Sequence, residues 1–230
     1  MPIASPLFER PLTPPRWALG IASLVLPDVV FSADTTEPVI ALTLDDGPHP
    51  HLTPRVLDVL AQHGARATFF LIGSRAERHG AVVGRIADEG HELGNHSWDH
   101  ASSARLSRAR LGESVRRTRD VLESYGPTRL FRPGSGWPTP TVLHVARHQG
   151  YRCVLGSIYP NDVRVRATDR IVEHVAEEAR PGAILVLHEG AAGRERVVTI
   201  LARALPELDQ RGFRVTTVST LLEGGASSAG

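Results

Sequence analysis

Ile40-Ala41-Leu42-Thr43-Leu44-Asp45-Asp46-Gly47-Pro48-His49-Pro50 is the stretch around which this chain of 230 residues is organised. Its apolar half has the length of a strand and is too short for a typical helix, and it stops at two adjacent carboxylates followed by a Gly-Pro turn signal. We therefore expect a buried strand that ends in a charged loop. Neighbouring carboxylates repel each other, and burying them costs stability unless a positive charge lies beside them. The stretch predicts that a positive charge lies between or beside Asp45 and Asp46.

The composition is that of a single globular domain. Hydrophobic residues make up 41% of the chain and charged residues 22%, and the length suffices for one sizeable core. The formal net charge is +1, with arginines and acidic residues interspersed, so we predict no nucleic-acid partner. No segment approaches the ~20 apolar residues of a membrane span. The lone Cys153 rules out an intrachain disulfide and has apolar neighbours, which predict a buried, inert thiol. The oligomeric state is left open.

Residues 1–38 form an N-terminal extension in our interpretation. Basic residues, an apolar run over 17–26 and small residues after it share features with a secretory signal. Pro27 cuts this run short, however, and residues 29–33 would pair naturally as a strand with 39–43 across a polar turn. We prefer this structural interpretation, which slightly favours a cytoplasmic location over a secreted one.

Past residue 38, short apolar segments alternate with segments of helical periodicity, which predicts a parallel α/β sheet, either an open doubly wound sheet or a barrel. In both architectures chemistry belongs at the carboxyl ends of the strands. We assign 39–223 to one domain and 224–230 to a flexible tail. The expected strands are 40–44, 67–71, 92–95, 130–132, 152–155, 183–187 and 213–217, and the expected helices are 54–63, 81–89, 107–125, 139–148, 169–179 and 194–210.

Acids, imidazoles and one guanidinium follow four of the expected strands. Because the carboxyl ends of parallel strands meet at one rim, we expect these side chains to converge. Two histidines four residues apart and a carboxylate can hold a divalent metal with open coordination positions; Zn²⁺ fits best, and Co²⁺, Mn²⁺ or Fe²⁺ are also accepted. The histidine spacing alone is a weak signal. The converging residues are Asp45, Asp46, His96, His100, Arg132 and His188.

The histidine pair differs from the zinc-protease helix, because no glutamate follows its first histidine. A general base must therefore come from elsewhere in the chain. From the residues alone, either Asp45 or Asp46 can supply it.

Four motifs together resemble a known family. In this order and spacing they are similar to the polysaccharide deacetylases of the NodB-homology type, carbohydrate esterase family four, over residues 39–217. The resemblance implies a distorted (β/α) barrel with about seven parallel strands. It also implies a metal-dependent hydrolase that cleaves the linear amide bond of an N-acetylglucosamine-containing glycan, chitooligosaccharide or peptidoglycan-like. The motifs are Thr43-Leu44-Asp45-Asp46-Gly47-Pro48, His96-Ser97-Trp98-Asp99-His100, Arg132-Pro133 with Gly136, and Leu185-Val186-Leu187-His188.

The resemblance also implies roles for single residues. Asp46, His96 and His100 would be the metal ligands. Asp45 would be the general base and His188 the general acid, on different strands so that they flank the substrate.

Further roles carried over from the family concern the surroundings of these groups. Arg132 would keep the base ionised and oriented, and Asp162 would tune the acid by its charge. The backbone N–H near Ser135 would help to stabilise the oxyanion. Leu187 and Trp137 would wall the pocket for the acetyl methyl group.

The chain departs from the family pattern in two motifs. The segment usually written Asp-x-x-Asp-Trp is Tyr159-Pro160-Asn161-Asp162-Val163, which keeps the second aspartate and lacks the first aspartate and the tryptophan. Gly134 and Ser135 replace a proline and an aromatic residue that are common after Arg132-Pro133. These departures predict an altered substrate pocket with the same chemistry.

Two other functions stay open. One is deacetylation of a small sugar conjugate or another amide in secondary metabolism, which the absence of an obvious glycan-binding extension motivates. The other is a non-catalytic glycan-binding module, which is disfavoured because the base, the acid and all three ligand positions are filled.

Overall fold

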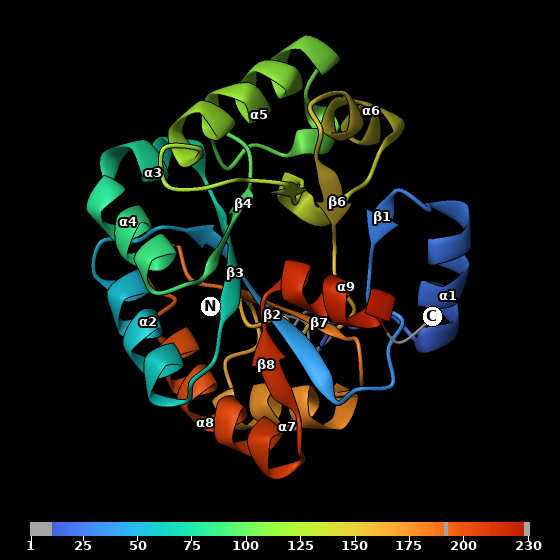
Figure 1. Ribbon diagram of the computed structural model, residues 1–230, viewed down its shortest axis with the longest axis vertical. Helices are drawn as coiled ribbons and strands as arrows, with labels where there is room; N and C mark the ends of the chain where they lie inside the picture. The colour runs from blue at the N-terminus through green and yellow to red at the C-terminus, as the bar shows by residue number, and fades with distance from the viewer. Residues whose placement is uncertain (1–10, 191–192, 228–230) are drawn as a thin grey trace, which may run out of the picture.

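A computed structural model describes residues 11–190 and 193–227 (Figure 1). One sheet of eight strands has the order β1-β6-β5-β4-β3-β2-β7, and β8 pairs with the start of β2. Every pairing between these named strands is parallel. The strands are β1 (Val29–Val30), β2 (Val39–Gly47), β3 (Ala67–Leu71), β4 (Glu92–Asn95), β5 (Leu130–Phe131), β6 (Arg152–Val154), β7 (Ile184–His188) and β8 (Arg214–Thr216).

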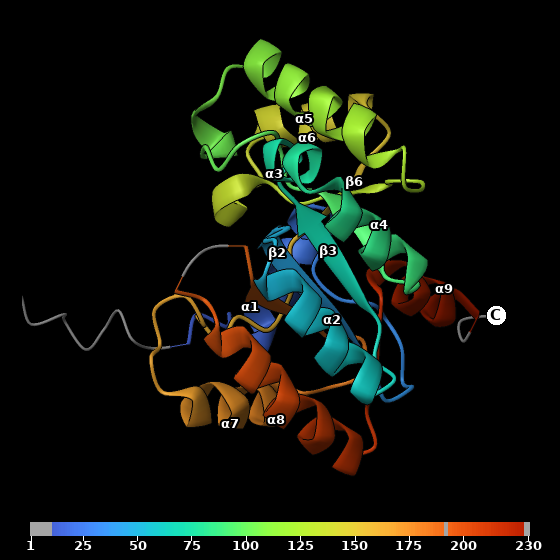
Figure 2. The same ribbon diagram turned by 90° about the vertical axis from the view of Figure 1, so that its left-hand side faces the viewer.

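The helices lie around the outside of the strands (Figures 1 and 2). Two isolated bridges, Ser32 with Ala183 and Ile158 with Leu185, join the segments after β1 and β6 to the β7 side of the sheet. The sheet therefore curls into a distorted (β/α) barrel, as the family resemblance implied. The helices are α1 (Arg16–Val25), α2 (Leu52–Gln62), α3 (Gly73–Arg78), α4 (Gly80–Asp88), α5 (Arg108–Leu122), α6 (Pro140–His148), α7 (Thr168–Glu178), α8 (Arg196–Gln210) and α9 (Val218–Ser227).

β2 is the central strand of the molecule. All nine of its residues are buried, and it pairs with β3 on one side and with β7 on the other. A strand that is covered on both faces needs a nearly continuous apolar sequence, which residues 39–44 provide. Leu42 and Leu44 pack with side chains of β3, β7, α2 and α8 in the largest hydrophobic cluster. Burying each such leucine contributes about 1.5–3 kcal/mol.

The predicted strands and helices past residue 38 are all present, with ends that differ by a few residues. The predicted pairing of residues 29–33 with 39–43 is wrong. β1 instead pairs in parallel with β6, Val29 beside Cys153 and Val30 beside Val154. The physical reason is that β3, β7 and β8 already occupy both edges of β2.

Sequence analysis missed three helices, α1, α3 and α9. The apolar run over 17–26 forms most of α1, which packs its Leu19 against β1 and β6. α9 continues to Ser227, past the expected start of the tail at 224, and residues 228–230 lie outside the described part. None of the helices in the described ranges is both long and apolar enough to cross a membrane. Cys153 is buried as predicted, and burial raises its pKa to about 12.

The expectation that Leu187 walls a substrate pocket is wrong. Successive side chains of a strand point to opposite faces, so Leu187 and His188 cannot share one. Leu187 is fully buried in the cluster between the sheet and its covering helices. It therefore belongs to the core.

Leu187→Ala should lower the free energy of unfolding by about 2–5 kcal/mol, because it leaves a cavity in a close-packed core. Urea unfolding followed by circular dichroism measures this loss. Leu24→Ala is the matched control, since Leu24 is 84% exposed on α1 and should change little. Equal losses of unfolding free energy in the two variants would show that Leu187 does not belong to the core.

Candidate active site

β2 ends in a bulge that brings two consecutive aspartates to one pocket. Asp45 pairs with Phe70 and Gly47 with Leu71, which leaves Asp46 as the extra residue. Asp46 has a φ of 71°, in the left-handed region that costs a residue with a side chain energy. A regular strand would send the two carboxylates to opposite faces, whereas the bulge allows both to line the same cavity.

Asp45 has a basic partner. Nη1 of Arg132, at the end of β5, lies 2.6 Å from Oδ1 of Asp45 and donates a second hydrogen bond of 2.7 Å to the hydroxyl of Thr43. The guanidinium also donates to the Val154 carbonyl at 3.2 Å and stacks 4.2 Å from the Phe70 ring. Asp45 is 4% exposed and Arg132 3%. Arg132 thus supplies a positive charge beside Asp45. Its hydrogen bonds and its contact with Phe70 hold the guanidinium in one orientation.

Asp46 has different partners. Its Oδ1 lies 3.5 Å from Nε2 of His96 and 3.2 Å from Nε2 of His100, while its Oδ2 lies 3.0 Å from Nη1 of Arg194. Burial alone raises the pKa of Asp46, but the hydrogen bond and charge of His96, with the charges of His188 and Arg194, more than offset this and hold the pKa well below its usual range. Asp46 is therefore an ionised acceptor at neutral pH.

The ring of His96 is oriented by a hydrogen bond from its other nitrogen, Nδ1. Its Nδ1 lies 2.7 Å from the carbonyl oxygen of Arg132, so Nδ1 carries the proton and donates to that carbonyl. Nε2 is then left facing Asp46, which is the arrangement of a histidine that ligates a metal and is held by an outer hydrogen bond. Asn95 at the end of β4 stabilises the turn that follows, since its Oδ1 accepts the N–H of Ser97 at 2.9 Å.

The donor set fits a divalent metal. In a tetrahedral zinc site with bonds of about 2.0–2.2 Å, neighbouring ligand atoms lie about 3.3–3.6 Å apart, close to the two separations between Asp46 and the imidazoles. Across the described ranges, no group of three or more histidine, cysteine, aspartate or glutamate side chains is arranged so that it could hold a metal ion as it stands. The side chain of His100 is 64% exposed, whereas His96 and Asp46 are buried, so His100 is the least enclosed of the three expected ligands.

His188 is held by the carboxylate of Asp162. Its Nδ1 lies 2.9 Å from Oδ1, and its backbone N–H donates to Oδ2 at 2.9 Å. Burial alone lowers the pKa of His188, but the charge and hydrogen bond of Asp162, followed by the charges of Asp45 and Asp46, raise it overall. With Nδ1 bound to Asp162, Nε2 is the nitrogen that can exchange a proton with a substrate.

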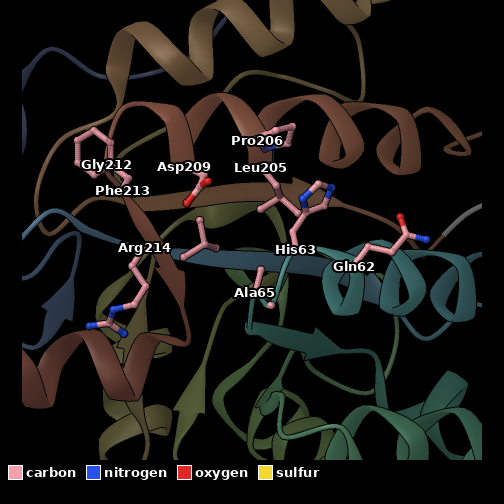
Figure 3. A pocket seen from close by; sticks show the side chains of 11 residues that line it. Gln62, His63, Ala65, Leu205, Pro206, Asp209, Gly212, Phe213 and Arg214 are labelled. Carbon is pink, nitrogen blue, oxygen red and sulfur yellow. The ribbon is translucent and has the colours of Figure 1, made fainter.

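These groups line one cavity of about 410 Å³ at the carboxyl ends of the strands. It contains both aspartates, both histidines of the pair, Arg132, Ser135 and His188. A second cavity of about 540 Å³ lies at the other end of the barrel, where His63 follows α2, Asp209 lies in the last turn of α8 and Arg214 begins β8 (Figure 3). That cavity holds none of the predicted site residues, so the site lies at the first.

The walls of the first cavity differ in part from the expectation. Val186, which shares a strand face with His188, lines the cavity in the position that we gave to Leu187. Trp137 is 67% exposed and is not among the lining residues. Ser135, with a φ of 71°, and Val163 both contribute to the wall.

Sequence analysis missed three ionisable residues beside the site. Arg75 on α3 donates to the backbone carbonyl of Asp46, and Arg194 contacts the carboxylate of the same residue. Glu189, directly after His188, is fully buried; burial raises its pKa to about 8, so it is mainly protonated at neutral pH. The position of Glu189 and Arg194 just after a strand's carboxyl end was the available signal; we had assigned Arg194 to the following helix.

The chain is similar in sequence to one protein family and to characterised members of it. The sequence profile described as polysaccharide deacetylase matches residues 32–154. A peptidoglycan-N-acetylglucosamine deacetylase of Bacillus cereus is 39% identical over 84% of this chain and 92% of its own length. A chitooligosaccharide deacetylase of a Bradyrhizobium species is 36% identical over 76% of this chain and 87% of its own.

Solved structures agree with these relatives. The crystal structure of a peptidoglycan N-acetylglucosamine deacetylase in complex with an N-hydroxybenzamide compound superimposes with a TM-score of 0.82 at 30% identity, covering 88% of this chain and 96% of that one. A mutant of a family-four pseudoenzyme, with restored enzymatic activity, superimposes with a TM-score of 0.77 at 25% identity, covering 84% and 71%. The family depends on a divalent metal. The chain belongs to the polysaccharide deacetylases of the NodB-homology type, carbohydrate esterase family four.

Proposed function

We propose that this deacetylase removes the N-acetyl group from an N-acetylglucosamine-containing glycan, either a chitooligosaccharide or a peptidoglycan-like polymer. The relatives with peptidoglycan and chitooligosaccharide substrates support this class. The observation that carries the proposal is the separation of the two aspartates at the end of β2. Asp45 pairs with a guanidinium, and Asp46 faces two imidazoles, so one is suited to proton transfer and the other to metal binding.

We assign the metal to Asp46, His96 and His100, with Zn²⁺ as the best match to one oxygen and two nitrogen donors. A divalent metal bound there supplies Lewis acidity, which activates water and polarises the acetamide carbonyl. In this proposal, Asp45 takes the proton of the attacking water on Oδ2, because Oδ1 is held by Arg132. Arg132 orients that carboxylate through its 2.6 Å contact with Oδ1.

His188 donates the second proton. An amine leaves readily only when it is protonated, and Asp162 raises the pKa of His188 above its ordinary value, which favours the form that carries a proton on Nε2. Ser135 lines the cavity, and its backbone N–H is our proposed donor to the oxyanion. Val186 forms the apolar wall for the acetyl methyl group in place of Leu187.

Deacetylation of a small sugar conjugate is the second candidate, because Val163 and Ser135 give the cavity different walls from the family pattern. A panel of chitooligosaccharides, peptidoglycan fragments and aminoglycoside-like conjugates separates the two candidates. Family membership alone does not exclude a non-catalytic protein, since the family contains a pseudoenzyme. Release of acetate that stops with a chelator and returns with metal would exclude it; no release from any substrate would refute the proposal.

Asp45→Asn should keep the metal and lose most of the turnover, whereas His96→Ala should lose both. Of these two residues, only His96 is assigned as a metal ligand. Metal content after dialysis and the rate of acetate release measure the two properties. Equal metal loss in both variants would show that the roles of the two aspartates are reversed or wrong.

His188→Ala should slow amide hydrolysis by about 10²–10⁴-fold, the usual contribution of a general acid. An activated acetate ester should lose far less, because its leaving group needs no proton. The ratio of the two rates is the measurement, and similar losses on both substrates would remove the assignment of His188.

Asp162→Asn should shift the alkaline limb of the kcat profile to lower pH. His188 must be protonated to act, so activity falls as the pH rises through its pKa, and removing the charge of Asp162 lowers that pKa. Asp169→Asn is the matched control, since Asp169 pairs with Arg203 at the surface. An unchanged alkaline limb in Asp162→Asn would contradict the coupling.

A further inference from the structure

Arg194 reaches the site from the segment between β7 and α8, two residues before α8 begins. Its Nη1 lies 3.0 Å from Oδ2 of Asp46, and its side chain is 19% exposed. This nitrogen is buried and makes no hydrogen bond within the described residues, so its contact with Asp46 is an ion pair without hydrogen-bond geometry. The charge of Arg194 thus lies beside one carboxylate oxygen of Asp46.

Gly190, at the start of this segment, is packed against the backbone of Asp46. Arg75 on α3 donates to the carbonyl oxygens of both Asp46 and Gly190. A Cβ atom on Gly190 would lie 1.6 Å from the carbonyl oxygen of Asp46, so only glycine allows this approach. The backbone of Asp46 is therefore fixed by Arg75 and Gly190, and its side chain is gripped by Arg194 from the same segment.

The two carboxylate oxygens of Asp46 face different groups. Oδ1 is directed at the imidazoles of His96 and His100, and Oδ2 at Arg194. The terminal torsion of an aspartate is broad, so an unrestrained carboxylate would rotate between one-oxygen and two-oxygen presentation. A partner on Oδ2 removes that freedom and leaves Oδ1 toward the histidines.

We infer that Arg194 is a positioning residue of the metal site: it holds Oδ2 of Asp46 so that Oδ1 is presented to a metal shared with His96 and His100. The inference rests on the proposed role of Asp46 as a ligand. The charge of Arg194 and its orienting contact with Asp46 predict opposite effects on metal affinity. A cation beside a dication lowers metal affinity by repulsion, whereas a partner that orients a ligand raises it, typically by 10–100-fold.

Competition between the protein and a chromophoric chelator for Zn²⁺ tests the inference without reference to catalysis. Arg194→Met should raise the Kd for Zn²⁺ by about 10–100-fold, and Arg194→Lys, which keeps the charge and one donor, should recover part of the affinity. Arg203→Met is the matched control, because Arg203 lies on α8 and pairs with Asp169 at the surface. This control should bind Zn²⁺ as the wild type does.

The outcomes separate the inference from the proposal beneath it. If the wild type binds Zn²⁺ and Arg194→Met binds it equally or more tightly, Arg194 has no positioning role and the metal site itself stands. If the wild type binds no Zn²⁺, both fail. Arg194→Gln carries the same expectation as Arg194→Met and replaces it should the methionine variant not fold.

Discussion

The site depends on the buried ion pair between Asp45 and Arg132. An uncompensated buried carboxylate costs several kcal/mol, and the neighbouring Asp46 would add repulsion. Arg132 resolves this with a charge at 2.6 Å, and its other contacts prevent it from turning to Asp46. Asp46 must then find its partners elsewhere, in the imidazoles of His96 and His100 and the guanidinium of Arg194. Two acids adjacent in sequence thus acquire separate environments.

The backbone makes this separation possible. β2 is buried along its whole length and needs its alternation for the core, so two consecutive residues could not both face the cavity without an irregularity. The bulge at Asp46 is that irregularity, and Gly190 on the neighbouring segment allows close approach to it. Strain at this point is characteristic of functional sites, where the surrounding structure fixes an unfavourable conformation.

Much of this was predictable from the sequence, for identifiable reasons. Period-two and helical patterns located the strands and helices past residue 38, and polar residues after strands located Asp45, Asp46, His96, Arg132 and His188. Strand pairing joins residues that are far apart in the sequence, and no local pattern shows it. The predicted partner of β1 was therefore wrong. Because side chains alternate along a strand, Leu187 and His188 point to opposite faces. The pocket-wall role that the family resemblance gave to Leu187 was therefore wrong. Arg194 was missed because we assigned it to the following helix, and Arg75 was missed because no sequence pattern shows which arginine of a helix turns inward.

The most direct test is a crystal structure of the zinc-loaded protein with anomalous data recorded at the zinc edge. Our account predicts one anomalous peak within bonding distance of Asp46, His96 and His100, with Asp45 still paired to Arg132. A peak bonded to Asp45, or none at this end of the barrel, would contradict the division of labour between the two aspartates.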